Sequence, residues 1–406
     1  MPITPEEFAA RRDALCEAMG GRGVALFLGH EHAATTYPGN PYPFRQESSF
    51  RYFFGLDEPD AAGLIDLASG EATLYGHEPD LDSVIWDGDL PALAERAAPF
   101  GPMAVAPNHR LPDDVTRHAG THTVPPTRGS MRLRLDALGI QGPSLQLVAA
   151  VVSLRERKSA AELGEIADAV DRAAVLHHLA FTEVAPGKTE EDIVRVMHAH
   201  AAAQGWATSY SPVFSVRGEV LHNPHHHNEL RPGDLIVHDG GVSSPAGYAS
   251  DITRTIPVSG AFTTEQATLY DIVLAAHDAV IDTVRPGIPY REMHDLAGRV
   301  ITEGLTEHGW MRGDVDESVE AGAFAAFLPH GVGHMLGLDV HDVGAYREDG
   351  QSTTLRPGMV LTVEPGLYIA PGSDAPKAFQ GVGVRIEDDV RSEEHTSELQ
   401  SRPHIS

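Results

Sequence analysis

The stretch LRPGDLIVHDG, residues 230–240, has a near copy in LRPGMVLTVEPG, residues 355–366. Each begins with LRPG, continues through an apolar run and reaches a carboxylate eight residues after its arginine, Asp239 in the first and Glu364 in the second. The apolar runs predict buried strands. A carboxylate at the end of a buried strand is costly unless it is paired or binds a metal. The repeated phrase therefore predicts two equivalent strands that each deliver an acid to one site.

The repeat extends beyond these two phrases. V-x-P-G occurs at 184–187 and at 284–287, and each copy precedes a predicted helix that ends in Gly-Trp, at 205–206 and 309–310. A capping box at 159–162, SAAE, predicts the start of the first helix of this domain. Because the same features recur in the same order, we expect two related halves. A pseudo-twofold axis would bring the two LRPG strands to equivalent places.

Each phrase is followed by a further predicted strand with another acid, Asp251 in YASDIT and Glu387 in GVRIE, so we expect each half to carry its two acids on a hairpin of these two strands. Four converging carboxylates would repel one another, and two divalent cations would offset that repulsion. The segment PHGVGHMLGLDVHDVG, 329–344, supplies three histidines among glycines, and imidazole is a common partner of carboxylates at metal sites. The sequence therefore predicts a dinuclear metal site between the two halves.

Each of these features is weak by itself. A single acid at a strand end is more often a turn residue. The HxxxH spacing lacks the glutamate of the HExxH zinc motif. The run of histidines at 225–227 is typical of a solvated loop. The four acids in repeated positions, together with HGVGH, are harder to explain as solvent-exposed polar residues without a function.

The chain of 406 residues is long enough for more than one domain. Residues 1–155 alternate short apolar runs with turns and predict a smaller α/β domain, with strands at 24–28, 50–54, 63–67 and 72–75. Residues 156–391 form the second predicted domain. RSEEHTSELQS, beginning at Arg391, resembles the translation of a sequencing adapter. We therefore expect 392–406 to be a non-native tail and the second domain to be truncated.

Bulk composition limits the function classes. The formal net charge of −28 argues against a nucleic-acid partner, which requires clustered Lys and Arg. No window has the apolar length of a membrane span. Cys16 is the only cysteine, so no intrachain disulfide is possible. With an N-terminus that lacks a signal pattern, these features predict a cytoplasmic protein.

Four stretches carry a resemblance to a known family: HGVGHMLGLDVHDVG at 330–344, TVEPGLYI at 362–369, GVGVRIEDD at 381–389 and GYASDITRT at 247–255. They closely resemble the pita-bread metallopeptidases, and within them the Xaa-Pro aminopeptidase (aminopeptidase P) group. PYPFRQESSFRYFFGLDEPDA at 41–61 resembles the N-terminal domain of that group. The resemblance implies an α/β (α+β) protein. Its C-terminal pita-bread (creatinase/aminopeptidase) fold would have pseudo-twofold halves and follow a smaller α/β N-terminal domain.

The resemblance also implies roles for single residues. Five match the ligands of a dinuclear site that is usually loaded with manganese: Asp239, Asp251, His334, Glu364 and Glu387. Asp251 and Glu387 would bridge the two ions. Four further residues match active-site positions outside the ligand set: His222, His330, His341 and Arg385. Tyr368 matches a nearby tyrosine, and Trp86 an aromatic residue that in tetrameric relatives reaches a neighbouring subunit's site.

The expected reaction is hydrolysis of the bond between an N-terminal residue and a following proline, by a hydroxide that bridges two divalent ions, most simply Mn²⁺. Glu364 would carry the proton from water to the proline nitrogen. The expected partners are proline-containing peptides and further copies of the chain, in a dimer or tetramer, with no nucleic acid or membrane. Two alternatives stay open: a prolidase-type Xaa-Pro dipeptidase, and a non-catalytic binding module on the same fold.

Overall fold

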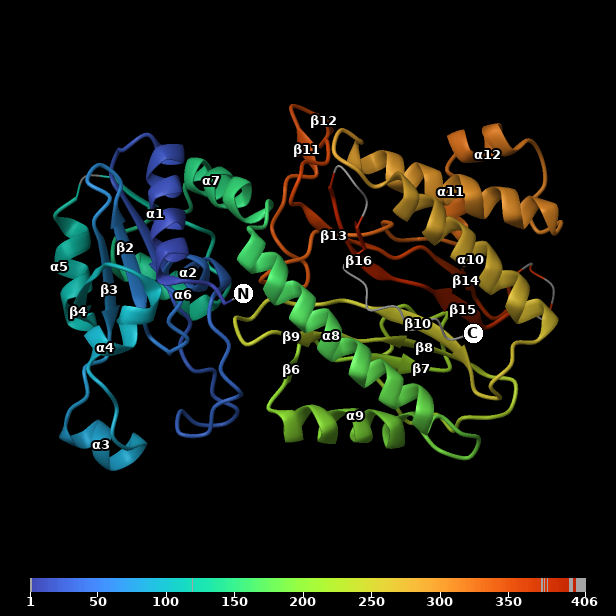
Figure 1. Ribbon diagram of the computed structural model, residues 1–406, viewed down its shortest axis with the longest axis horizontal. Helices are drawn as coiled ribbons and strands as arrows, with labels where there is room; N and C mark the ends of the chain where they lie inside the picture. The colour runs from blue at the N-terminus through green and yellow to red at the C-terminus, as the bar shows by residue number, and fades with distance from the viewer. Residues whose placement is uncertain are drawn as a thin grey trace. The chain divides into compact units, whose positions relative to one another are not determined.

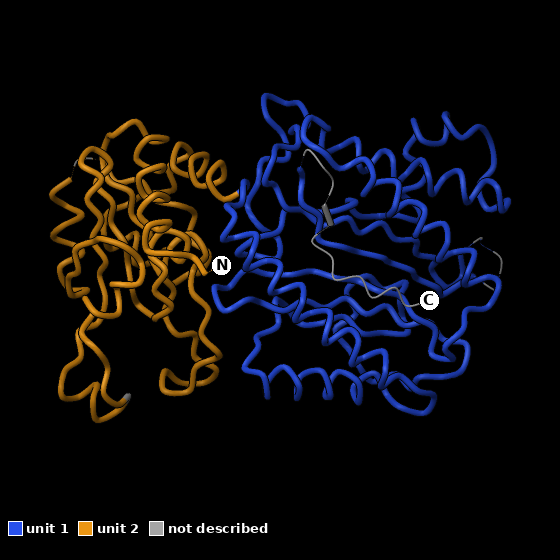
Figure 2. Tube along the Cα trace, in the orientation of Figure 1, with its two compact units in different colours: residues 1, 156–406 blue, residues 2–155 orange. Residues whose placement is uncertain are grey.

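The computed structural model describes residues 2–118, 120–373, 375, 377, 379–393 and 397–398. The chain divides into two compact units, one of residues 2–155 and one that begins at Glu156 (Figure 2). None of the helices in the described ranges has both the length and the hydropathy needed to cross a membrane. Most of the predicted non-native tail, residues 394–396 and 399–406, lies outside the described residues.

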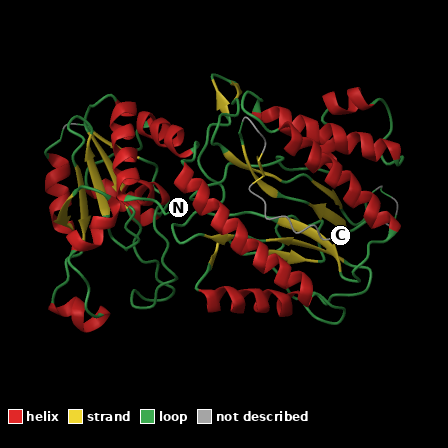
Figure 3. Ribbon diagram, viewed as in Figure 1, coloured by secondary structure: helices red, strands yellow, loops and turns green. Residues whose placement is uncertain are grey.

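Residues 2–155 form a five-stranded mixed sheet in the order β4-β3-β2-β1-β5, with helices around it (Figure 3). The three central strands β3, β2 and β1 pair antiparallel. The two edge strands are parallel to their neighbours, β4 to β3 and β5 to β1. The strands are β1 Val24–Leu28, β2 Ala62–Asp66, β3 Ala72–Gly76, β4 Ala104–Pro107 and β5 Thr121–Thr123. The α-helices are α1 Pro5–Met19, α2 Ser48–Phe54, α3 Leu81–Asp87, α4 Leu93–Ala97, α5 Leu111–Thr116, α6 Gly129–Ala137 and α7 Leu145–Arg155.

The strand predicted at 50–54 is wrong, because this aromatic run forms helix α2. The Glu47 carboxylate caps the helix by accepting a hydrogen bond from the Phe50 amide at 2.6 Å. At the other end, the guanidinium groups of Arg11 and Arg12 donate to the carbonyls of Tyr52 and Phe53. These contacts satisfy backbone groups that a short helix leaves without partners. They are non-local, so the residue pattern of 50–54 does not contain them.

The unit that begins at Glu156 has two sets of helices beside two sets of strands. Figure 1 shows α8 and α9 beside the strands β7, β8 and β10, and α10 and α11 beside β13 to β16. The helices are α8 Ala160–Glu183, α9 Glu190–Gln204, α10 Thr264–Thr283, α11 Tyr290–Glu307 and α12 Val315–Glu320. The main strands are β7 Val213–Ser215, β8 Leu235–Asp239, β10 Thr253–Pro257, β13 Val360–Val363, β14 Gly366–Ile369, β15 Val382–Arg385 and β16 Asp388–Arg391. Shorter strands are β6 Ala207–Thr208, β9 Val242–Ser243, β11 Arg347–Glu348, β12 Gln351–Ser352 and β17 Ser397–Glu398.

The repeated sequence features have matching backbone hydrogen bonds. In the first half the Gly187 amide donates to the Leu230 carbonyl at 2.8 Å, and in the second the Gly287 amide donates to the Leu355 carbonyl at 2.9 Å. The predicted capping box of α8 is present, with Ser159 and Glu162 bonded reciprocally. Each V-x-P-G turn is thus tied to the leucine that opens the LRPG phrase of its own half.

Strand β15 of the second half passes very close to the backbone of the first half. A Cβ atom added at Gly383 would lie 2.1 Å from the carbonyl group of Gly218. Because the obstacle is the backbone of Gly218 and not a movable side chain, relief would require β15 or the turn at Gly218 to shift. Glycine at 383 therefore allows the two halves to approach.

We expect Gly383→Ala to lower the free energy of unfolding of this unit by roughly 1–3 kcal/mol, the usual cost of overpacking. The matched control is Gly129→Ala, at the start of α6, where an added Cβ meets nothing within 4 Å. Scanning calorimetry of both variants measures the effect. Equal midpoints for the two variants would contradict the close approach.

Candidate metal centre

Two buried strands deliver the acids of the repeated phrases. All five residues of β8 are buried, and Asp239 is the last of them. All four residues of β13 are buried, and Glu364 follows directly. The predicted buried strands are therefore confirmed. The partner strands bring the further acids Asp251 and Glu387 to the same ends. Thr253 of β10, two residues after Asp251, lies opposite Asp239, and Asp388 of β16, the residue after Glu387, lies opposite Val363.

The pairing in the second half differs from the sequence-based expectation. The stretch 383–387 does not run beside β13, because its residues up to Arg385 pair with β14. Pro365 explains the exchange: it lacks an N–H group and cannot continue a ladder of hydrogen bonds. The chain therefore passes from the pair β13–β16 to the pair β14–β15 at two places, at Glu364-Pro365 and at Ile386-Glu387. This connection places Glu364 and Glu387 close together.

A backbone bridge between the halves lies beside Asp251 and Glu387. Glu387 pairs with Thr253 across an isolated β-bridge, in which the Glu387 amide donates to the Thr253 carbonyl at 3.1 Å. The Thr253 hydroxyl donates to Glu387 Oε2 at 2.6 Å. The Asp251 amide donates to Asp389 Oδ2 at 3.1 Å. Asp251 and Glu387 thus come from different halves and are fixed by backbone contacts.

His334 enters the cluster with one ring nitrogen directed at the acids. Its Nδ1–H donates to the Met335 carbonyl at 3.1 Å, which leaves Nε2 without its proton when the ring is neutral. That Nε2 lies 3.4 Å from Asp251 Oδ2 and 3.6 Å from Glu364 Oε1. One ligand atom each of Asp251, His334 and Glu387 lies within 4.8 Å of the others. The structure therefore brings these three predicted residues together, with Glu364 beside them.

Asp239 lies at the same place and has two further partners. Arg385 Nη2 lies 2.5 Å from Asp239 Oδ2. The Tyr210 hydroxyl lies 2.5 Å from Asp239 Oδ1 and also contacts Asp251 Oδ1. Tyr210 was not predicted. It precedes β7 in a loop with no counterpart in the repeat, so no pattern in the sequence indicates it.

The carboxylates of the cluster are electrostatically strained. Burial raises the pKa of Glu387 well above its ordinary value, and the charges of Asp251 and Glu364 raise it further. The pKa of Asp251 is raised in the same way, by burial and then by Asp239, against the opposing effect of His334. Burial raises the pKa of Glu364 to about 7, although His334 and Arg385 oppose the shift. Buried acids whose ionised forms repel one another, beside an imidazole nitrogen, form a donor set that fits divalent cations.

A second set of predicted residues forms a hydrogen-bonded chain beside Glu364. Arg385 Nη1 donates to the Tyr368 hydroxyl at 3.1 Å, and that hydroxyl lies 2.9 Å from His330 Nε2. His330 Nδ1 lies 2.7 Å from the Gly331 carbonyl and 3.9 Å from Glu364 Oε2. The structure thus places Arg385 and His330, two of the predicted site residues, beside the acids.

The remaining predicted histidines face a cavity of about 440 Å³ that opens on the acids. His222 and His341 line it together with Asp239, Asp251 and Tyr210. The His341 ring stacks on His334, with ring centroids 4.0 Å apart. His222 is exposed on the rim of this cavity. His226, from the run of histidines at 225–227, also lines the cavity.

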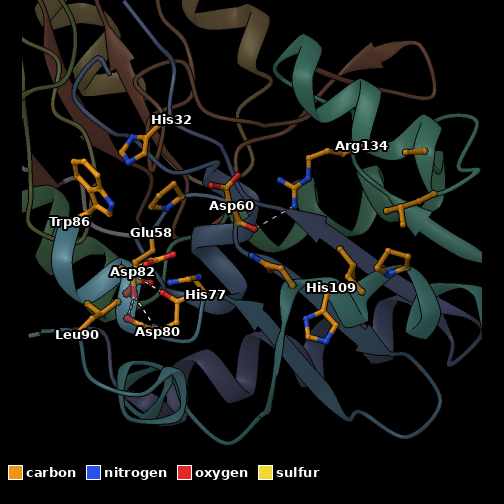
Figure 4. Close-up of a pocket in the computed structure, with 17 residues that line it drawn as sticks. His32, Glu58, Asp60, His77, Asp80, Asp82, Trp86, Leu90, His109 and Arg134 are labelled. Carbon is orange, nitrogen blue, oxygen red and sulfur yellow. Dashed lines mark hydrogen bonds between the residues drawn. The ribbon is translucent and has the colours of Figure 1, made fainter. Parts of the chain in front are cut away.

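Trp86 belongs to the unit of residues 2–155. It lies on α3, is 84% exposed and lines a cavity of about 1130 Å³ with His32, His77 and Asp80 (Figure 4). Among the described residues, the cluster of Asp251, His334 and Glu387 alone has three ligand atoms close enough to hold an ion, so this larger cavity has none. The cavity beside the acids is therefore the candidate site of chemistry.

Comparison with known proteins gives the family. Residues 164–394 match metallopeptidase family M24, and residues 8–124 match the aminopeptidase P, N-terminal domain. The chain belongs to metallopeptidase family M24. The Xaa-Pro aminopeptidase of Escherichia coli (strain K12) is 35% identical over 413 residues, which cover 96% of this chain and 92% of that protein.

Solved structures of the family agree with this assignment. The structure of Pseudomonas aeruginosa aminopeptidase PepP superposes with a TM-score of 0.91 at 31% identity, covering 98% of this chain and 95% of that chain. Zn-substituted E. coli aminopeptidase P in complex with product superposes with a TM-score of 0.88 at 32% identity, covering 99% and 96%. The predicted fold, a pita-bread domain preceded by a smaller N-terminal domain, is confirmed.

Metal removal gives a pH-dependent test of the centre. Acids with raised pKa values hold protons in the metal-free protein, and the folded state loses stability as the pH rises through those values. Metal binding requires the deprotonated acids and removes their repulsion. We therefore expect added Mn²⁺ to raise the melting temperature of chelator-treated protein more at about pH 8 than at about pH 5.5.

The control for this experiment is Asp251→Asn, which should lose most of the Mn²⁺-induced gain at both pH values. Differential scanning fluorimetry measures the midpoints. A larger gain at the lower pH, or no gain for the wild type at either pH, would count against this metal centre.

Proposed function

We propose that this protein is a metal-dependent Xaa-Pro aminopeptidase, which hydrolyses the bond between an N-terminal residue and a following proline. One observation supports the proposal most strongly: acids from both halves converge with His334, and two of these acids, Asp239 and Asp251, open on a cavity that His222 and His341 line. Two related strands deliver the acids, in a chain whose sequence relatives at 33–35% identity include the Xaa-Pro aminopeptidases of Escherichia coli and Haemophilus influenzae. Buried, mutually repelling acids in an open cavity are unfavourable for stability alone.

We propose that five residues hold two divalent ions: Asp239, Asp251, His334, Glu364 and Glu387. Asp251 and Glu387, which come from different halves and lie beside each other, would contact both ions. We propose manganese as the metal, since the ligands are mostly carboxylates. The bound ions would supply an activated water and polarise the scissile carbonyl. Restoring activity of the chelated enzyme with Mn²⁺, Co²⁺ and Zn²⁺ in turn identifies the preferred ion.

Glu364 is the proposed proton carrier. Its carboxylate lies among the other proposed ligands, with Oε1 3.6 Å from His334 Nε2 and Oε2 3.9 Å from His330 Nδ1, so it is placed to exchange a proton with water held at the site. It would take the proton from the attacking water and pass it to the proline nitrogen. That nitrogen leaves as a secondary amine and requires a proton, because an unprotonated amide anion is too basic to be a leaving group.

His330 and His341 differ in their capacity to donate a hydrogen bond to the substrate. His330 Nδ1 faces the Gly331 carbonyl, which only accepts, so Nδ1 carries the proton. Burial lowers the pKa of His330 to about 4, so the ring is neutral and Nε2 accepts from Tyr368. Both nitrogens of His330 are therefore used. His341 has no hydrogen bond to another described residue, so we propose that it donates to the developing oxyanion.

We propose that His222 positions the substrate from the rim of the cavity, and that His330 helps to hold the substrate from its place beside Glu364. We also propose that the protein acts in the cytoplasm, which the single cysteine supports. A homo-oligomer, a dimer or tetramer, is proposed from the apolar side chains that α3 exposes, Leu81, Ile85 and Trp86. Sedimentation of the wild type and of Trp86→Ser tests the oligomer.

The central experiment is Glu364→Gln, assayed on Ala-Pro-Gly-Gly with Mn²⁺. We expect kcat to fall by roughly two to four orders of magnitude while the fold is kept, because proton transfer of this kind contributes about that much. The matched control is Glu307→Gln, at the exposed end of α11, which should retain activity. Near-wild-type turnover by Glu364→Gln would sink the assignment of Glu364.

The same assay separates the two alternatives. Cleavage of Ala-Pro but not of Ala-Pro-Gly-Gly would identify a dipeptidase. No turnover of either substrate, with no manganese, cobalt, iron or zinc near two equivalents by elemental analysis, would identify a binding module. An aminopeptidase releases alanine from the longer peptide.

The hydrogen-bond pattern of the histidines gives a further prediction. We expect His341→Ala to lower kcat by roughly 100-fold or more, because it removes an oxyanion donor. His330→Ala should raise KM more than it lowers kcat, because both of its ring nitrogens already have partners. Steady-state kinetics of both variants on one X-Pro peptide measure this. The reverse ranking in kcat would show that His330 is the donor.

A further inference from the structure

The two halves use the same helix position to hold a loop. Glu190 and Tyr290 each lie three residues after the glycine of the V-x-P-G turn, in the first turn of α9 and of α11. The Glu190 amide donates to the Asn228 carbonyl at 3.0 Å, and the Tyr290 amide donates to the Thr353 carbonyl at 2.8 Å. The preceding residues form matching bridges, Thr189 with Glu229 and Pro289 with Thr354. Glu190 and Tyr290 are therefore structural equivalents.

Glu190 ties together the two ends of the loop that carries His222. Its side chain is fully buried, with 0% exposure. Oε1 accepts from the Val216 amide at 2.7 Å and from Asn228 Nδ2 at 3.0 Å. Oε2 accepts from the Asn228 amide at 3.2 Å and from Asn228 Nδ2 at 3.0 Å. The carboxylate thus bonds to both residues that bracket the stretch 217–227.

The Glu190 carboxylate has no basic partner within salt-bridge distance among the described residues. Its burial is therefore compensated by N–H donors alone, which is tolerable only when the donors are fixed. The buried carboxylate depends on the N–H groups of an ordered loop, and the same hydrogen bonds hold the ends of that loop in place. Glu190 does not line the cavity that His222 lines, so its effect on that cavity passes through the loop.

Tyr290 holds the segment that carries His334. Its hydroxyl donates to the carbonyl of Gly333, the residue before His334. Its ring packs edge-on against Tyr346, with centroids 5.1 Å apart. The Tyr346 hydroxyl accepts from the amide of Met335, the residue after His334, at 3.0 Å. The backbone on both sides of His334 is therefore fixed from the start of α11.

We propose that Glu190 and Tyr290 are paired positioning residues, each of which holds one histidine of the active site from the equivalent helix start of its half. Glu190 acts through His222 on the substrate, and Tyr290 acts through His334 on the metal. The inference rests on the proposed function. It assigns different measurable effects to two equivalent positions, so each can be tested separately.

For Glu190, the test is Glu190→Gln alone and combined with His222→Ala. The glutamine amide places an NH₂ group against N–H donors, so the loop should shift. We expect kcat/KM on Ala-Pro-Gly-Gly to fall roughly 10- to 100-fold, mainly through KM, as for a small misplacement of a positioning group. In the His222→Ala background the same change should have almost no effect, since residues that act through one another are not additive.

The matched control is Glu191→Gln, the next residue of α9, which is exposed and bonds Arg195. It should leave kinetics unchanged. If Glu190→Gln does not fold, Asn228→Ala removes two of the four bonds and should show a smaller loss that also disappears without His222. A loss that persists at full size in the His222→Ala background would overturn the positioning role.

For Tyr290, the test is Tyr290→Phe, with Mn²⁺ binding measured by calorimetry on chelated protein. We expect Mn²⁺ affinity to fall roughly 10- to 100-fold, the usual effect of losing a group that orients a ligand. Tyr270→Phe on α10, whose hydroxyl has no hydrogen bond to another described residue, is the control and should bind Mn²⁺ normally. Glu190→Gln should also bind Mn²⁺ normally.

The outcomes separate this inference from the proposed function. Wild-type protein that binds Mn²⁺ but cleaves no X-Pro peptide would count against the function, while the Tyr290 result would still stand on binding alone. Active wild type with unchanged Mn²⁺ affinity in Tyr290→Phe, or with unchanged kcat/KM in Glu190→Gln, would overturn the inference and leave the function intact.

Discussion

Repulsion among buried carboxylates is the constraint on which the unit beginning at Glu156 depends. Strand pairing and backbone hydrogen bonds hold Asp251 and Glu387 in place, so the acids cannot relax apart. Asp388 is a buried acid whose charge is offset by cationic side chains instead. Burial alone would raise its pKa, but Arg254 at 2.7 Å and His277 at 3.0 Å lower it. Glu387, one residue earlier, forms no ion pair with another described residue, and Arg385 only partly opposes the rise in its pKa from burial and the neighbouring acids. A divalent ion is the compensation that fits these surroundings.

Arg385 connects this charge balance with the geometry of the cavity. Its guanidinium group reaches Asp239 of the first half and the Tyr368 hydroxyl of the second. One cation therefore offsets a proposed ligand of one half and holds the Tyr368 hydroxyl, which lies 2.9 Å from His330 Nε2. Because these contacts are buried and shared, a change in any of them should affect both charge and orientation.

Much of this arrangement could be predicted from the repeated LRPG phrases, because a duplicated strand that ends in an acid implies equivalent places for both acids. The predictions failed where the deciding contact was non-local. Helix α2 depends on carbonyl contacts from Arg11 and Arg12, and the strand exchange at Pro365 depends on which neighbour is available. Tyr210 joins Asp239 and Asp251 through a single hydroxyl on an irregular loop, and such a contact leaves no periodic signal.

The same reasoning explains why the equivalent helix starts carry different residues. The loop of the first half presents N–H groups, from Val216 and Asn228, so the residue at position 190 must accept, and a carboxylate offers two acceptor atoms. The segment of the second half presents the Gly333 carbonyl, so the residue at 290 must donate, and a phenol supplies one donor on a rigid ring. The backbone hydrogen bonds at the two helix starts are alike, whereas the polarity of each loop determines which side chain can hold it.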